Sequence, residues 1–231
     1  MTDNFYIFMA VSFFEWFAMV FFMITFFRIP FKSHIPQVVT LSFAMSLISY
    51  VLRGIGLADY IVTIQMLIYV IFVFIIFRIH YFYAIFVGMV GYHGYMVCEV
   101  MTYWVLSYTG VGEASDVKPF NYLYFIILFS SILLPLLVSA IMKKMQFGFT
   151  FVPNNEHKGV SFKDKNNVIL LIVAGLDLYF GNVSYRLIVS NHTDLFFIIT
   201  LTQLIVMAYF LHHSIQNEIK RHEEKYGLKP F

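Results

Sequence analysis

The sequence predicts an all-α membrane protein built as a bundle of about seven transmembrane helices, and three observations lead to this class. Hydrophobic residues make up 60% of the 231-residue chain and charged residues 12%, whereas a soluble domain carries about 25% charged residues because its surface faces water. The mean hydropathy of the chain is +0.78. Several apolar segments also reach the length of roughly 20 residues that a helix needs to cross about 30 Å of hydrocarbon.

The first predicted span covers residues 5–27 and is followed directly by the basic residues Arg28 and Lys32. A secretory signal peptide has a shorter apolar region and ends at a cleavage site made of small residues. We therefore expect the first span to be retained in the membrane.

Six further segments are interpreted as spans by the same length criterion. They cover residues 37–57, 60–77, 81–107, 120–142, 167–189 and 194–213. The span 37–57 is the least certain, because Arg53 lies near its end and three serines dilute it. These serines are Ser42, Ser46 and Ser49. We predict a transmembrane helical bundle over residues 1–213 and a cytoplasmic polar helical tail over residues 214–231.

The distribution of basic residues predicts the orientation, because cytoplasmic segments of membrane proteins are enriched in Lys and Arg. With the N-terminus outside, 12 of the 15 Lys and Arg residues fall in segments on the inner side. The three that fall on the outer side are Arg53, Lys118 and Arg186. We therefore predict a multi-pass protein of the cell membrane with the N-terminus outside and the C-terminus in the cytoplasm.

Ionisable side chains within the predicted spans are the main candidates for function. An Asp, Lys or Arg at mid-span costs about 2.5–3.5 kcal/mol on insertion scales, so such residues face the bundle interior or pair with one another. Glu15 and Asp177 lie near the middle of their predicted spans. We interpret these two residues as candidates for intramembrane coupling.

A second set of polar residues is interpreted as ligand-binding: His93, Tyr95, Glu99, Arg53 and Arg186. Glu99, Arg53 and Arg186 are expected at outer-leaflet depth, where they would form a charged outer vestibule, and His93 is expected near the middle of its span. His93 and Glu99 are six residues apart, which is about 240° around a helix, so they do not share a face well. The alternative is structural: the two arginines extend to the interface, and Glu99 is neutral and satisfied by a tyrosine.

The segment GMVGYHGYMVCEV, residues 88–100, places Gly88, Gly91 and Gly94 three residues apart. Residues at this spacing share a helix face, and without side chains they let a second helix approach closely. We predict that the fourth span is central and tightly packed, with the frequent occurrence of glycine in membrane helices as the alternative explanation. In the fifth span, Pro135 removes a backbone donor and is expected to bend the helix.

No residue pattern predicts catalysis, a cofactor or a metal. The HExxH, phosphate-loop and GxSxG motifs are absent from the sequence, and these are the common signatures of metalloproteases, nucleotide hydrolases and serine hydrolases. The single cysteine, Cys98, excludes an internal disulfide and a multi-cysteine metal site. We expect neither an enzyme nor a nucleic-acid-binding protein.

Three features of the sequence resemble a known family. They are SFFEWFAMVFFMITFFRIPFK at residues 12–32, SLISYVLR at residues 46–53 and the charged helix predicted at 214–226. In layout they resemble the N-terminal multi-span sensor region of agr-type, peptide-sensing bacterial histidine kinases. The resemblance implies about six or seven spans, an outward N-terminus and a cytoplasmic helix after the last span.

The sequence departs from that family after the spans. The segment RHEEKYGL around His222 is similar to a phospho-acceptor box, but the following Asn-containing segment and an ATP-binding domain are missing. This departure favours a stand-alone sensor-like protein or a fragment of a longer one.

Three functions follow from these observations. The first is a bacterial membrane sensor or accessory signalling protein that binds an extracellular peptide or small lipophilic signal and relays it through the tail to a cytoplasmic partner or a second copy. The second is a small secondary transporter or a substrate-capturing transporter subunit, for which mid-span carboxylates suit proton or cation coupling. The third is a structural or assembly subunit of a membrane complex.

Overall fold

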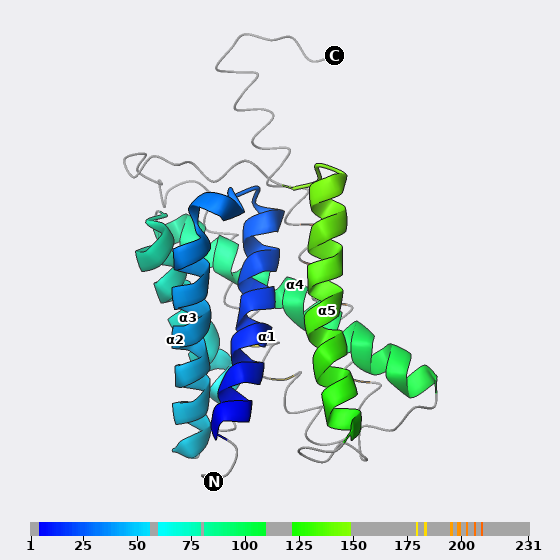
Figure 1. Cartoon of the computed structure of the whole chain (residues 1–231). Coiled ribbons are helices and arrows are strands. Elements are labelled where there is room, and N and C mark those ends of the chain that lie inside the picture. The colour runs from blue at the N-terminus through cyan, green and yellow to red at the C-terminus, as the bar shows by residue number, and fades with distance from the viewer. Residues whose placement is uncertain are drawn as a thin grey trace.

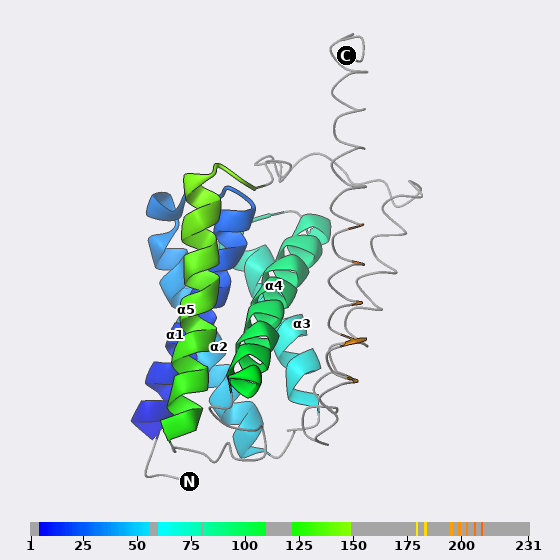
Figure 2. The same ribbon diagram turned by 90° about the vertical axis from the view of Figure 1, so that its right-hand side faces the viewer.

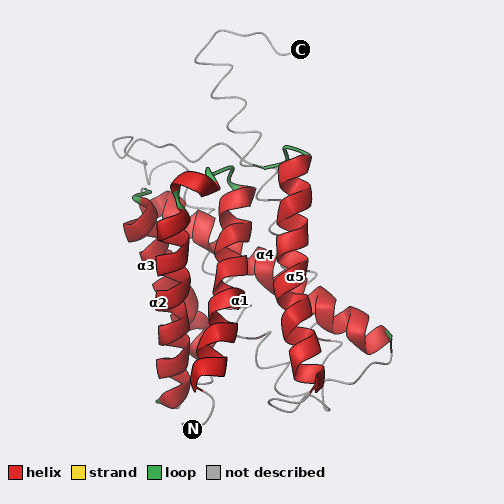
Figure 3. Ribbon diagram, in the orientation of Figure 1, coloured by secondary structure: helices red, strands yellow, loops and turns green. Residues whose placement is uncertain are grey.

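The computed structural model describes residues 5–55, 60–79, 81–109 and 122–148, together with eight single positions between 179 and 209. The described residues form α-helices and one 3-10 helix, with no strand among them (Figure 3), which confirms the all-α class for this part of the chain. The elements are α1 (Phe5–Phe26), η1 (Phe31–Ser33), α2 (Ile35–Gly54), α3 (Ile61–Phe77), α4 (Tyr81–Tyr108) and α5 (Tyr122–Lys144).

The five α-helices lie within three residues of the first five predicted spans at each end. Three segments are long and apolar enough to cross a membrane, namely α1, α2 and Phe125–Lys144 of α5, which is compatible with a membrane protein. Helix α3 is also apolar but has 17 residues. The predicted spans 167–189 and 194–213 lie outside the described residues except at single positions, and the tail 214–231 lies wholly outside them.

Helices α1 and α4 form the central pair of the described bundle. Helix α1 contacts α2, α4 and α5, while α4 contacts α1, α3 and α5. In Figure 1, α2, α1 and α5 stand side by side and α4 runs obliquely behind them; the turned view in Figure 2 shows the same oblique course. Polar residues on α1 and α4 can therefore meet inside the bundle.

Three glycines of α4 permit the close approach of its neighbours, as their spacing predicts. A Cβ on Gly88 would lie 2.9 Å from Val70 Cγ2 of α3, and a Cβ on Gly91 would lie 2.7 Å from Met23 Cβ of α1. At Gly94 the added atom would collide with the ring of Phe22. A larger residue at any of these positions would force a packed side chain of α1 or α3 to shift, so the glycines favour close packing of α4 against both helices.

Helix α2 shows how the bundle combines a polar interior with an apolar exterior. Its serines are buried, and each hydroxyl donates to the backbone carbonyl four residues earlier; Ser42, for example, lies 2.8 Å from the Val38 oxygen. The exposed side carries an apolar row at a four-residue spacing, Val39, Phe43, Leu47 and Val51. The serines that made this span the least certain therefore belong to the helix–helix interface, where small residues are favoured in membranes.

Candidate functional site

Two neighbouring residues of α1, Glu15 and Trp16, make polar interactions with different partners. Trp16 is buried with 5% of its surface exposed, whereas Glu15 is half-buried. Successive residues of a helix are separated by about 100°, so Trp16 and Glu15 meet different neighbours. Trp16 contacts α2, α3 and α4, and Glu15 interacts with residues of α4 and α2.

On the Trp16 side, three helices meet at the hydroxyl of Ser49. The Trp16 indole N–H donates to Ser49 Oγ at 3.0 Å, and the Gln65 side-chain amide donates to the same oxygen at 2.8 Å. Ser49 Oγ in turn donates to the Met45 carbonyl at 2.9 Å. A hydroxyl has one donor and two acceptor sites, so all of them are used. We call Trp16, Ser49 and Gln65 the polar node.

On the Glu15 side, two carboxylates from different helices come together. Glu15 of α1 lies within electrostatic range of Glu99 of α4 and of Arg53 of α2. Tyr95, one helical turn before Glu99, is buried and lies within the same range of both carboxylates. We call Glu15, Tyr95, Glu99 and Arg53 the carboxylate group. It unites one residue predicted for coupling with three predicted for ligand binding.

The basic member of this group, Arg53, lies near the end of α2. Its side chain is exposed, and its guanidinium carbon lies 5.0 Å from the centre of the Phe8 ring of α1. This cation–π contact contributes about 0.5–1 kcal/mol at an exposed site. Arg53 attracts both acidic side chains of the group while its own side chain stays exposed.

Tyr95 connects the carboxylate group to α5. Its side chain interacts with that of Ser131, which is buried and donates to the Leu128 carbonyl at 2.9 Å. The group is therefore bordered by four helices, α1, α2, α4 and α5. A ligand seated there would contact elements on both sides of the central α1–α4 pair.

His93 belongs to the aromatic core of the bundle. It is buried, and its Nδ1–H donates to the Met89 carbonyl at 3.1 Å within α4. Its ring lies 5.9 Å from that of Tyr92, which in turn lies 6.4 Å from Trp16. This position agrees with the helical spacing, which separates His93 from Glu99. Its predicted ligand-binding role is not tested by this arrangement.

The remaining sequence candidates are placed as follows. Asp177 and Arg186 lie outside the described residues. Cys98 is buried in α4. Within the described ranges, no group of three or more His, Cys, Asp and Glu side chains is arranged to hold a metal ion.

The sequence analysis missed the polar node and the role of Ser131. One signal was present: Ser42, Ser46 and Ser49 follow a spacing of four and three residues, which places them on one face of a helix. A polar face on an otherwise apolar span indicates a helix–helix interface. The partners of Ser49 could not be read from that spacing, because they come from two other helices.

Comparison of the chain with protein-family models, curated proteins and solved structures finds no match. The resemblance to agr-type sensor regions therefore stays a prediction from layout. The function has to be argued from the carboxylate group and the charge distribution.

Proposed function

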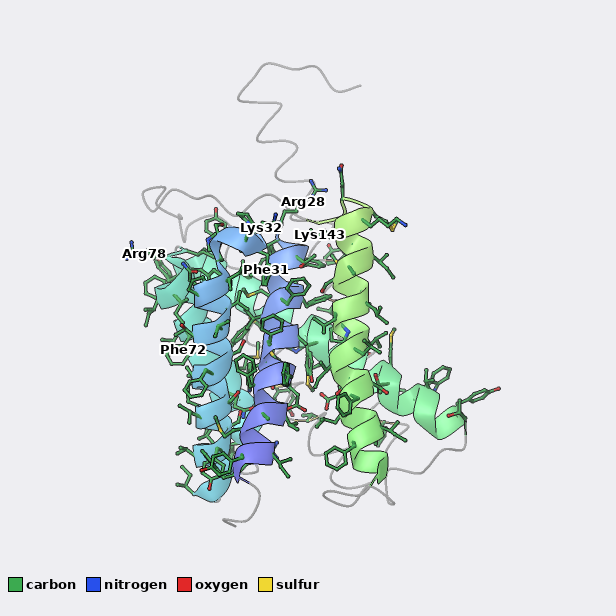
Figure 4. All side chains as sticks on the ribbon, viewed as in Figure 1. Arg28, Phe31, Lys32, Phe72, Arg78 and Lys143 are labelled. Atoms are coloured by element: carbon green, nitrogen blue, oxygen red, sulfur yellow. The ribbon has the colours of Figure 1, made fainter. Side chains whose placement is uncertain are left out.

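We propose that this chain is a multi-pass cell-membrane protein of seven spans, N-out and C-in, that senses an extracellular signal at the carboxylate group. The charges of the described helices support this orientation. Arg28, Lys32, Arg78 and Lys143 gather at one end of the bundle (Figure 4), and Arg53 ends α2 at the other. Basic residues are enriched on the cytoplasmic side of membrane proteins, so the carboxylate group opens outward.

The proposal is supported by the electrostatic interaction of Glu15 on α1 with Glu99 on α4, two helices that contact one another. Like charges repel strongly where water is scarce, and intramembrane carboxylates mark ligand or ion sites. A cationic or donor-rich ligand relieves this repulsion. The matching class is an extracellular peptide or small lipophilic signal that carries an amine.

The carboxylate group includes residues of both α1 and α4, so binding of a ligand there can change how these two helices pack. A ligand changes the state of a protein to the extent that it binds one state better than the other. A cation held by both carboxylates favours the state in which α1 and α4 lie closest. The proposal then requires the tail 214–231 to carry that change to a cytoplasmic signalling protein or to a second copy of the chain.

The same carboxylates favour a secondary transporter as the second candidate. Acidic residues on different helices near mid-membrane serve as proton or cation sites in such proteins. The two candidates differ at the tail. Removal of residues 214–231 abolishes output of a sensor and leaves ligand binding intact, whereas liposome uptake by a transporter survives the truncation and is lost in Glu15→Gln.

The ligand site can be probed without knowing the ligand. In a Cys98→Ser background, Glu99→Cys is exposed on intact cells to membrane-impermeant methanethiosulfonates carrying either a trimethylammonium or a sulfonate group. Because Glu15 remains, we expect the cationic reagent to react about tenfold faster than the anionic one. Adding Glu15→Gln should bring the two rates together.

A matched control lies on the same helix. Val105 is 52% exposed on the apolar outer surface of α4, and Val105→Cys should react slowly with both reagents. An unreactive Glu99→Cys, or one that prefers the anionic reagent, would contradict the proposed site.

A further inference from the structure

Five basic side chains surround the end of the bundle opposite the carboxylate group. They come from the ends of α1, α3 and α5 and from η1, and all are exposed. We call them the basic rim: Arg28, Lys32, Arg78, Lys143 and Lys144. Figure 4 shows Arg28, Lys32, Arg78 and Lys143 at this end, and Lys144 is the last residue of α5.

Arg28 holds a backbone conformation that favours glycine. After α1, the Ile29 N–H donates to the Ile24 carbonyl at 2.8 Å and the Arg28 N–H donates to the Thr25 carbonyl at 3.1 Å. These two bonds form a Schellman ending, whose left-handed position is occupied by Arg28 with φ 51°. Glycine is usual there because a side chain is strained in that conformation.

An arginine also occupies the left-handed position at the end of α3, where Arg78 has φ 52°. It follows the repeated sequence pattern FFRI at 26–29 and IFRI at 76–79. Two helices therefore end with a strained arginine whose guanidinium is exposed.

The end of α5 is held close to Arg28. A Cβ on Gly148 would lie 3.0 Å from Arg28 Cγ and 2.8 Å from the Phe26 carbonyl oxygen. The chain leaving α5 therefore passes against the end of α1, which brings Lys143 and Lys144 to the same rim as Arg28. The rim is a fixed feature of the packed helix ends.

No acidic side chain among the described residues compensates this rim. The described acids are Glu15 and Glu99, which belong to the carboxylate group. Phe31, between the rim cations, packs edge-to-face on Phe21 with ring centres 5.1 Å apart and anchors the η1 turn to the apolar bundle. The cations lie where the apolar helices end, which in the proposed membrane orientation is the level of the lipid phosphates.

We infer that the basic rim binds the phosphodiester of an anionic phospholipid in the inner leaflet, with Arg28 and Arg78 as its principal contacts. A guanidinium binds phosphate through two parallel N–H donors, which an ammonium does not match. This inference rests on the proposed membrane orientation for its leaflet. It is independent of the outward-facing ligand site.

The test uses the purified full chain in micelles of a neutral detergent. Its thermal midpoint is followed by tryptophan fluorescence during titration with phosphatidylglycerol, phosphatidylcholine or inorganic phosphate. A ligand that binds the folded state raises the midpoint in proportion to its affinity. We expect phosphatidylglycerol alone to do so, and Arg28→Gln/Arg78→Gln to weaken the apparent affinity about 25-fold, at about fivefold for each lost cation.

A second variant separates lipid binding from folding. Arg28→Gly/Arg78→Gly should raise the midpoint in neutral detergent, because the left-handed strain is relieved, and should weaken the apparent affinity for phosphatidylglycerol by the same factor of about 25. Gln146 has φ 53° at the end of α5, so Gln146→Gly relieves the same strain without removing a charge. It should keep the full lipid response.

Three outcomes would overturn the inference. They are an equal response to phosphatidylcholine, a response reproduced by inorganic phosphate, and an unchanged lipid response in the glycine double variant. None of them bears on the thiol reactivity of Glu99→Cys. Failure of the lipid inference and failure of the proposed sensor are therefore distinguishable.

Discussion

The polar node and the carboxylate group include successive residues of α1, Trp16 and Glu15, and they differ in how their polar atoms are paired. In the node, the Ser49 hydroxyl donates once and accepts twice, at distances between 2.8 and 3.0 Å. In the carboxylate group, Glu15 and Glu99 face one another as like charges. A buried network in which every member is bonded makes a core specific. A pair of like charges costs stability, and it is retained where a ligand or ion uses it.

This difference explains why neighbouring residues of α1 are expected to respond oppositely to substitution. Removing a polar group from the node should destabilise the bundle, because its partners stay behind without a bond. Removing the charge of Glu15 or of Glu99 should not. Substitutions in the node and in the carboxylate group test each region by itself, and separation of α1 from α4 tests the contact between the two helices.

The largest effect is expected at Gly94, which permits the α1–α4 contact on which the carboxylate group depends. Gly94→Val would place atoms in the ring of Phe22, and we expect a loss of about 3 kcal/mol or more, at the upper end of the range for overpacking. Chemical unfolding in detergent measures it. Gly54→Ala is the control because a Cβ there meets nothing within 4 Å; an equal loss in both variants would show that the close approach is unimportant.

A smaller loss is expected at the polar node. Ser49→Ala leaves the indole N–H of Trp16 and the amide of Gln65 without their acceptor, which should cost about 1–2 kcal/mol in a membrane bundle. Trp16→Phe should lower the free energy of unfolding by less than Ser49→Ala does. The double variant should lose less than the sum of the two single losses, because both substitutions remove the same hydrogen bond between Trp16 and Ser49. Ser42 bonds its own helix backbone, so Ser42→Ala is the matched control. Additive losses would show that the node is not a network.

The smallest effect on stability is expected in the carboxylate group, with the opposite sign. Glu99→Gln removes one of two like charges, so the free energy of unfolding should stay unchanged or rise by up to about 1 kcal/mol. The same holds for Glu15→Gln, and the double variant should gain nothing further. Unfolding of all three in parallel checks this, and a loss as large as that of Ser49→Ala would assign Glu99 a structural role.

The fold of the first part of the chain could be predicted from hydropathy and length. Those properties locate apolar helices whatever they pack against, and the five described helices lie where spans were expected. The spacing of Gly88, Gly91 and Gly94 likewise predicted a close helix contact, because three-residue spacing defines one face. Charge counting predicted which helix ends carry cations.

The sequence predicted single candidate residues of the site but not which of them lie together. Periodicity assigns Glu15 and Glu99 to faces of their own helices, but the rotation of α1 against α4 depends on contacts such as that of Gly94 with Phe22. For this reason the meeting of the two carboxylates had no signal in the sequence. The serines of α2 were interpreted as a weakness of the span for the same reason, because their partners lie on α1 and α3.

The central claim is that the carboxylate end of the bundle faces outward and the basic rim faces the cytoplasm. Two exposed residues at opposite ends of α2 test it directly, Ser33 beside the rim and Ile55 beside Arg53. In a Cys98→Ser background, each is replaced by cysteine and treated on intact cells with a membrane-impermeant maleimide. The account predicts that Ile55→Cys is labelled at once and Ser33→Cys only after the membrane is permeabilised. Labelling of Ser33→Cys on intact cells, with Ile55→Cys protected, would contradict it.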